Sequence, residues 1–201
     1  MPSLLRQHLA ALRALLVLTV LLGLLYPLLV TGVAQLVAGD RADGQLLRRD
    51  GVVVGSALIG QSFTDSAGTA LPQYFQSRPS AAGDGYDGAS SSASNLGPND
   101  AGLLETVTQR RAEVAQREGV TPAQVPADAV TASGSGLDPQ ISPQYARIQV
   151  ARVAATRGLT EQQVQRLVAE HSSGRDLGFI GAPHVDVLAL NLALDAIGGP
   201  S

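Results

Sequence analysis

The chain has 201 residues and a formal net charge of −3, which allows one domain plus a membrane anchor rather than two large domains. It contains no cysteine, and its basic residues are all arginine, so thiol chemistry and sites that need a lysine amine, such as Walker A loops, are excluded. From Asp40 onward 12 arginines face 17 acidic residues, a balance of −5 that excludes nucleic acid as a partner.

The first predicted element is a transmembrane helix over residues 14–38. No charged residue lies among the 26 residues between Arg13 and Asp40. About 20 apolar residues suffice to cross the hydrocarbon core. Pro27 removes one backbone hydrogen bond, so we expect a bend there. Four residues at spacings of four along the helix are candidates for packing on another membrane helix: Thr19, Gly23, Thr31 and Gln35.

Flanking charge predicts the orientation of this helix. Arg6 and Arg13 precede it with no acidic residue nearby, whereas Asp40, Arg41 and Asp43 follow it. Because arginine is enriched on the cytoplasmic side, residues 1–13 are predicted to be cytoplasmic and residues 39–201 to form an extracytoplasmic domain. A cleaved signal peptide is the alternative. The apolar run exceeds the 7–15 residues of a signal peptide, and it lacks a convincing small-x-small cleavage site.

The segment that follows the helix is rich in turn formers. Residues 40–50 are predicted to be a polar linker, and residues 51–60 to form one or two short strands broken at Gly55. Residues 80–100 are rich in Ser, Gly and Asp, which favours either a flexible linker or a loop held against a partner.

Helices dominate the second half of the chain. Apolar spacing predicts a helix over 101–118, with Glu113 and Arg117 paired on its outer face. Ser142 and Gly158 have the residue types of an N-cap and a C-terminal glycine, and Thr160 with Gln163 of a capping box. These signals predict helices over 143–158 and from 160 to about 171, before a core helix over 185–199. The predicted fold is therefore α+β: one N-terminal transmembrane helix, then a single helix-rich domain with a few short strands.

Catalytic and metal sites find little support. His171, His184 and Asp186 have no recognisable metal-ligand spacing, and no Gly-x-Ser-x-Gly elbow favours any serine as a nucleophile. We therefore predict no catalytic residue and no bound metal.

The turn-forming segment 131–143, which we call the serine–glycine turn, is the most distinctive part of the domain. Its small residues permit unusual backbone angles and close approach. Anion binding before the helix start is a weak alternative, because no lysine is present and an aspartate is adjacent. We predict instead a partner-facing or fold-critical element, with these candidate residues: Ser133, Gly134, Ser135, Gly136, Asp138 and Pro139.

At this segment the sequence resembles the C subunit of the bacterial Kdp potassium-transporting P-type ATPase. The motifs that carry the resemblance are GSALIGQSF (55–63), YFQSRPSA (74–81), SASNLGP (92–98), TASGSGLDPQISP (131–143), QVARVAATRGL (149–159) and VDVLALNLALD (185–195). They cover nearly the whole chain in family order, and Asp186 stands where the family usually has Asn. The motifs add Arg78, Ser94 and Asn95 to the candidate interface or fold-critical residues. Arg78 is expected either to pair with a partner carboxylate or to be solvated.

The resemblance implies a subunit of a high-affinity, ATP-driven potassium uptake complex in the bacterial inner membrane. Its implied partners are a potassium-conducting subunit, an ATP-hydrolysing P-type subunit and a small stabilising subunit, besides the lipid bilayer. ATP and potassium are then handled by the complex, and no cofactor is expected on this chain. Family members are described as catalytic chaperones that raise the ATP affinity of the pump subunit. An extracytoplasmic domain conflicts with direct contact with cytoplasmic ATP. The alternative is a stand-alone, membrane-anchored extracytoplasmic binding protein or hydrolase.

Overall fold

The computed structural model describes residues 2–197 and divides the chain into two compact units, residues 1–46 and residues 47–201. The fold is α+β, as predicted. Each unit is described by itself.

The first unit is a long apolar helix in three parts. These are α1 (Pro2–Val20), the π-helical turn η1 (Leu21–Leu25) and α2 (Tyr26–Ala42). Its described side chains are largely exposed, and among residues 2–197 the run from Ser3 to Ala42 is the helix long and apolar enough to cross a membrane. This confirms the predicted apolar N-terminal helix, which extends beyond the uncharged segment at both ends.

The backbone accommodates Pro27 differently from the predicted bend. The Tyr26 amide donates to the Leu21 carbonyl, the wider spacing of a π-helical turn, immediately before the proline that cannot donate. Helical backbone angles are lost instead at Ala38 (φ −150°, ψ 52°).

The second unit begins with a β-hairpin where a linker was predicted. Strands β1 (Leu46–Arg49) and β2 (Val52–Ser56) are joined by Asp50 and Gly51, both left-handed (φ 51° and 80°). An Asp-Gly pair with these angles matches the twist of a hairpin, so the linker prediction for 40–50 was wrong. Strand β2 also runs through Gly55 rather than breaking there.

A second small sheet lies deeper in this unit. Strand β5 (His184–Asp186) pairs antiparallel with β3 (Gln140–Ile141) on one side and with β4 (Ser172–Ser173) on the other. Residues 185 and 186 were predicted to begin the last helix, which was wrong because they lie in β5; residues 198 and 199, predicted as the end of that helix, lie outside the described residues. Residues 184–186 are extended because this segment forms backbone hydrogen bonds with a neighbouring strand on each side.

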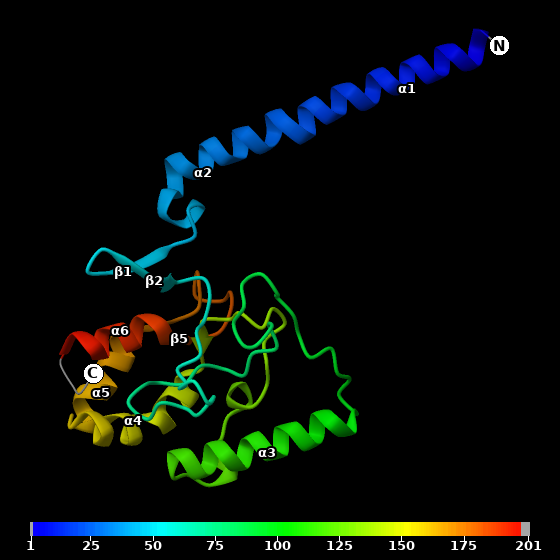
Figure 1. The fold of residues 1–201 in the computed structure, drawn as a ribbon. Helices are drawn as coiled ribbons and strands as arrows, with labels where there is room; N and C mark the ends of the chain where they lie inside the picture. The colour runs from blue at the N-terminus through cyan, green and yellow to red at the C-terminus, as the bar shows by residue number, and fades with distance from the viewer. Residues whose placement is uncertain (1, 198–201) are drawn as a thin grey trace. The chain divides into compact units, whose positions relative to one another are not determined.

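The predicted helices are confirmed, and Figure 1 shows them gathered in the second unit. They are α3 (Ala101–Glu118), α4 (Pro143–Arg157), α5 (Glu161–Glu170) and α6 (Val187–Ile197), with short 3₁₀ turns η2 (Pro122–Gln124) and η3 (Ala127–Ala129). The Ser142 side chain caps α4 by accepting from the Tyr145 amide, and left-handed Gly158 ends it. Thr160 and Gln163 form the predicted capping box of α5.

The core of the second unit is built around α4. Its buried face supplies Tyr145, Val150 and Val153, which pack in one cluster with Leu190 of α6 and with Phe75. Phe75 belongs to neither a helix nor a strand, so an irregular segment crosses the middle of the core. Such a segment must satisfy its backbone groups without a helix or sheet ladder.

Candidate assembly site and its buried supports

The serine–glycine turn and Arg78 meet in an ion pair within the chain. Arg78 Nη1 lies 2.8 Å from Asp138 Oδ2, and Asp138 Oδ1 accepts from the Gln140 amide at 3.0 Å. The Arg78 side chain is 22% exposed. Within the chain the guanidinium is therefore paired with a carboxylate and partly buried rather than fully solvated.

Ser80 ties the residues after Arg78 to the same turn. Its hydroxyl donates to the Gly136 carbonyl at 2.6 Å and accepts from the amides of Ala82 and Tyr86. The Tyr86 hydroxyl in turn donates to the Arg78 carbonyl at 2.8 Å. Burial raises the pKa of Tyr86 to about 12, so its hydroxyl stays protonated and able to donate at physiological pH.

Gly136 lies where two backbone segments come together. Its φ of +70° is left-handed, and a Cβ built on it would lie 2.5 Å from the Ser92 carbonyl oxygen and 2.8 Å from the Ala82 amide nitrogen. By contrast, a Cβ on Gly134 would meet no atom within 4 Å. The structure thus separates two glycines that look equivalent in sequence.

The 80–100 segment packs on its own chain at several points. The Ser92 amide and the Ser91 hydroxyl both bind the Ser135 carbonyl, at 3.0 Å. Ser94 and Asn95 are exposed further along the segment, and Asn95 is left-handed (φ 52°). Part of the predicted linker is therefore bonded to the serine–glycine turn.

The remaining turn residues are used locally. Ser135 Oγ accepts from the Leu137 amide and lies 3.4 Å from Ser133 Oγ. The Pro139 carbonyl accepts from the amide of Val187, at the start of α6. The turn is thus joined to a core helix as well as to Arg78.

The four membrane-helix candidates form two local groups. A Cβ on Gly23 would lie 3.9 Å from Thr19 Cγ2, so these residues share a face. Thr31 Oγ1 donates to the Pro27 carbonyl at 2.8 Å, and Gln35 Nε2 donates to Asp43 Oδ1 at 2.7 Å. Each residue of the second pair therefore donates one hydrogen bond within the first unit.

Two buried side-chain amides missed by sequence reasoning hold the irregular core segment. Asn191 Oδ1 accepts from the Phe75 amide and Asn191 Nδ2 donates to the Phe75 carbonyl, each at 2.9 Å. Gln149 Oε1 accepts from the Gln76 amide at 2.7 Å, and Gln149 Nε2 donates to the Gln76 carbonyl at 3.2 Å. Each amide replaces the strand that the segment lacks. A polar residue inside an apolar stretch, such as Asn191 in VDVLALNLALD, was the available signal.

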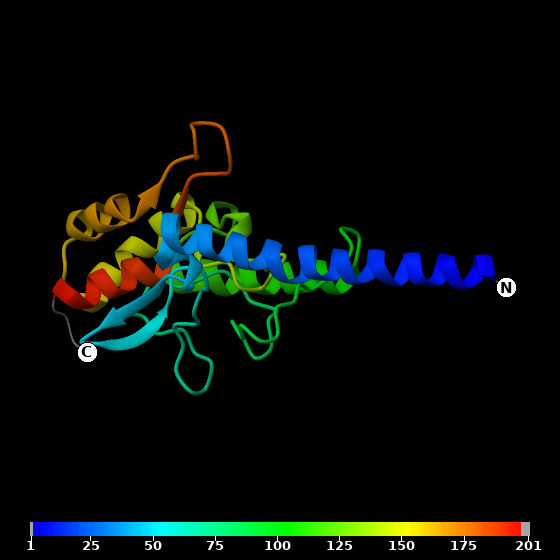
Figure 2. The same cartoon turned by 90° about the horizontal axis from the view of Figure 1, so that it is seen from above.

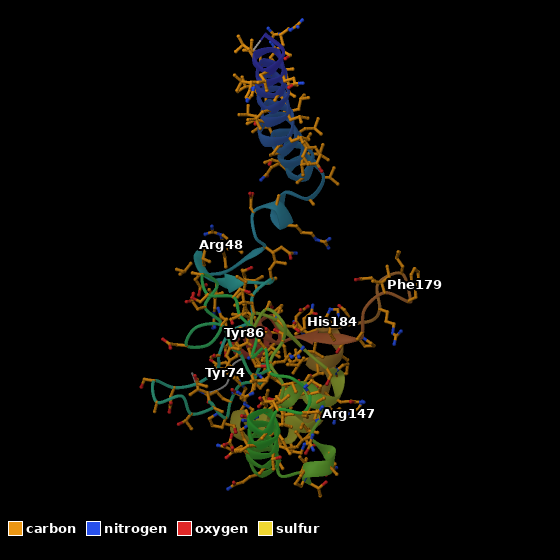
Figure 3. All side chains as sticks on the ribbon, turned by 90° about the vertical axis from the view of Figure 1, so that its right-hand side faces the viewer. Arg48, Tyr74, Tyr86, Arg147, Phe179 and His184 are labelled. Atoms are coloured by element: carbon orange, nitrogen blue, oxygen red, sulfur yellow. The ribbon has the colours of Figure 1, made fainter. Side chains whose placement is uncertain are left out.

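Buried arginines hold the preceding part of this segment. Arg157 Nε donates to the Gln73 carbonyl, and its Nη2 binds Asp195 Oδ1, both at 2.7 Å. Its guanidinium also lies over the Tyr74 ring, 4.9 Å from the ring centre; Tyr74 is labelled in Figure 3. Arg49 of the hairpin completes the network with Asp195 Oδ2 at 3.1 Å.

Glu118 is the anchor of a second buried network. Its side chain is 0% exposed and binds Arg117 at 2.7 Å and Arg152 at 2.8 Å. Arg152 also donates to the Tyr74 carbonyl. The predicted Glu113–Arg117 pair is therefore wrong: Arg117 turns toward Glu118 because a buried carboxylate needs a charged partner.

Two open hollows flank Arg78. One, of about 480 Å³, is also lined by Tyr86, Arg110 and Arg117. The other, of about 410 Å³, is also lined by Asp128, Asp138 and His184. Among residues 2–197 no group of three or more His, Asp or Glu side chains could hold a metal ion.

The buried polar side chains described above hold the backbone of two irregular segments in place. Arg157, Gln149 and Asn191 bind the carbonyls and amides of residues 73–76, and Ser80 binds the serine–glycine turn. This use of buried polar groups stiffens loops in one arrangement, which suits a preformed binding surface.

Known proteins resemble this chain over nearly its full length. Residues 8–196 match the family described as KdpC, the K+-transporting ATPase, c chain. A potassium-transporting ATPase KdpC subunit of Kineococcus radiotolerans is 58% identical over 194 residues, which is 96% of this chain and 95% of that protein. The same-named subunit of Mycobacterium tuberculosis is 54% identical over 96% of this chain and 99% of its own length. That of Beijerinckia indica subsp. indica is 52% identical over 94% of each chain.

Proposed function

This chain belongs to the KdpC family of potassium-transporting ATPase subunits, and from that premise we propose that it is the accessory, non-catalytic subunit that assembles and stabilises the potassium uptake complex. The observation that carries the proposal is the match of residues 8–196 to the family. The same match favours this function over a stand-alone binding protein or hydrolase.

The first unit supports a docking role in the membrane. In the most apolar stretch of the candidate span from Ser3 to Ala42, no residue is buried within the chain. Such a surface is free for lipid and for helices of other subunits, and Thr19 and Gly23 share a face narrow enough for close approach. We assign the contacts to the potassium-conducting, ATP-hydrolysing and small stabilising subunits as part of the proposal.

The proposed topology has residues 1–13 in the cytoplasm, 14–38 in the inner membrane and 39–201 outside. Its support is the pair Arg6 and Arg13 before the span and the acidic balance after it. In this topology the domain and cytoplasmic ATP lie on opposite sides of the bilayer. We therefore propose that the chain raises the ATP affinity of the pump subunit indirectly, by stabilising one conformation of the assembled complex.

Omitting the chain tests this function. The complex is purified through a tag on the ATP-hydrolysing subunit, with and without this chain, and potassium-stimulated ATP hydrolysis is measured over a range of ATP concentrations. We expect the chain to co-purify and its omission to lower the yield of complex and raise the KM for ATP about tenfold, a coupling of about 1.4 kcal/mol. Unchanged yield and KM would contradict the proposal.

A further inference from the structure

One loop of the second unit exposes three large apolar side chains within four residues of the sequence. The loop, residues 174–183, joins β4 to β5. Leu177 is 82% exposed, Phe179 70% and Ile180 49%. Figure 2 shows this orange loop standing clear of α5 and α6, and Figure 3 shows Phe179 at its outer end and His184 at its base. We call Leu177, Phe179 and Ile180 the apolar tip. Large apolar side chains that are exposed together on one loop are typical of interaction sites.

The apolar tip is held in shape by its own backbone. Asp176 and Ile180 exchange two backbone hydrogen bonds, each of 2.9 Å, and the Gly178 amide donates to the Arg175 carbonyl at 3.1 Å. Leu177 is left-handed (φ 52°), a conformation that costs a bulky residue about 1–3 kcal/mol. A preformed tip loses little conformational entropy on binding, which favours insertion into a shaped protein pocket.

Charge argues against a lipid surface as the occupant. In residues 47–201, 11 arginines face 15 acidic residues, so an anionic bilayer repels this unit. The tip is flanked by Arg175 and Asp176, whose charges cancel, and the chain has no lysine that would add attraction.

The area of the apolar tip is too small for the tip alone to hold two proteins in a stable complex. At these exposed fractions, three side chains of about 200 Å² each offer roughly 400 Å². A stable interface needs about 800 Å² from each partner. The tip therefore suits a second contact between two proteins that are already attached elsewhere. Such a contact forms readily because the first attachment raises the effective concentration of the tip near its binding site.

We propose that the apolar tip docks into an apolar pocket on another subunit of the potassium-transporting ATPase, on the same side of the membrane as this domain. The membrane helix supplies the first attachment and the tip the second. This inference rests on the proposed function, since it requires the chain to be part of the complex.

Photo-crosslinking within the assembled complex tests the contact directly. A benzophenone amino acid replaces Phe179 in the full chain, or Leu104, an exposed residue of α3 (69%), as the matched control. We expect an adduct between position 179 and another subunit of the complex, at least tenfold stronger than from position 104. An adduct only with lipid, an adduct only with a second copy of this chain, or a signal no stronger than the control overturns the proposal.

Retention in the complex supplies a second readout. The double variant Leu177→Ser/Phe179→Ser should co-purify about tenfold less than the unsubstituted chain, whereas Leu104→Ser should co-purify normally. Both variants change exposed side chains, so their thermal unfolding should match that of the unsubstituted chain. Full retention of the double variant overturns the docking inference alone. Failure of the unsubstituted chain to co-purify contradicts the proposed function as well.

Discussion

Gly136→Val lowers the free energy of unfolding of the domain by about 4 kcal/mol, combining left-handed backbone strain of about 1–3 kcal/mol with overpacking of similar size. The glycine has a φ of +70°, and any Cβ would lie 2.5 Å from the Ser92 carbonyl oxygen, a backbone atom that cannot rotate away. Unfolding of the full chain in detergent, followed by the near-ultraviolet circular dichroism of its tyrosines, measures the loss.

Gly134→Val is the matched control for this effect. Gly134 lies two residues away in the same turn, is exposed, and has no atom within 4 Å of an added Cβ. We expect its stability to stay within about 0.5 kcal/mol of the unsubstituted chain. Equal stability of the two variants would show that the turn opens at Gly136 and that its close approach is not fold-critical.

Gln149→Leu is expected to lower the free energy of unfolding about as much as Gly136→Val, because it leaves buried polar groups without partners. Gln149 is 0% exposed and bonds both the amide and the carbonyl of Gln76. Leaving a buried donor or acceptor unsatisfied costs about 1–3 kcal/mol, so two such groups predict a loss of roughly 4 kcal/mol. Chemical denaturation of the full chain in detergent measures it.

Gln144→Leu on the same helix provides the comparison. Gln144 is exposed, so the substitution removes the same side-chain amide without stranding a buried group. We expect a change of no more than about 0.5 kcal/mol. A loss in Gln149→Leu no larger than that in Gln144→Leu would mean that residues 73–76 are not held by side-chain amides.

Local signals explain how much of the fold could be predicted. Ser142, Gly158 and the Thr160–Gln163 box act within one helical turn, so they marked the ends of α4 and α5 correctly. The long uncharged run similarly marked the apolar N-terminal helix. The Asp50–Gly51 turn was equally local and was overlooked within a stretch read as a linker.

Long-range pairing explains what could not be predicted. Nothing around Gln149 or Asn191 shows that their partners lie in residues 75–76. The same holds for Arg78 and Asp138, which lie 60 residues apart in the sequence and are brought together by folding alone. The sequence singled out the serine–glycine turn, but only the structure shows that Gly136 is closely approached and Gly134 is open.

The side of the membrane on which the domain lies tests the account most directly. The chain has no cysteine, so a single cysteine at Ser66→Cys, an exposed position in the second unit, or at Ser3→Cys reports sidedness without background from the chain itself. A membrane-impermeant maleimide is applied to intact spheroplasts that express the complex. The account predicts labelling of Ser66→Cys in intact spheroplasts and of Ser3→Cys only after permeabilisation; the reverse pattern would place the domain beside ATP and contradict it.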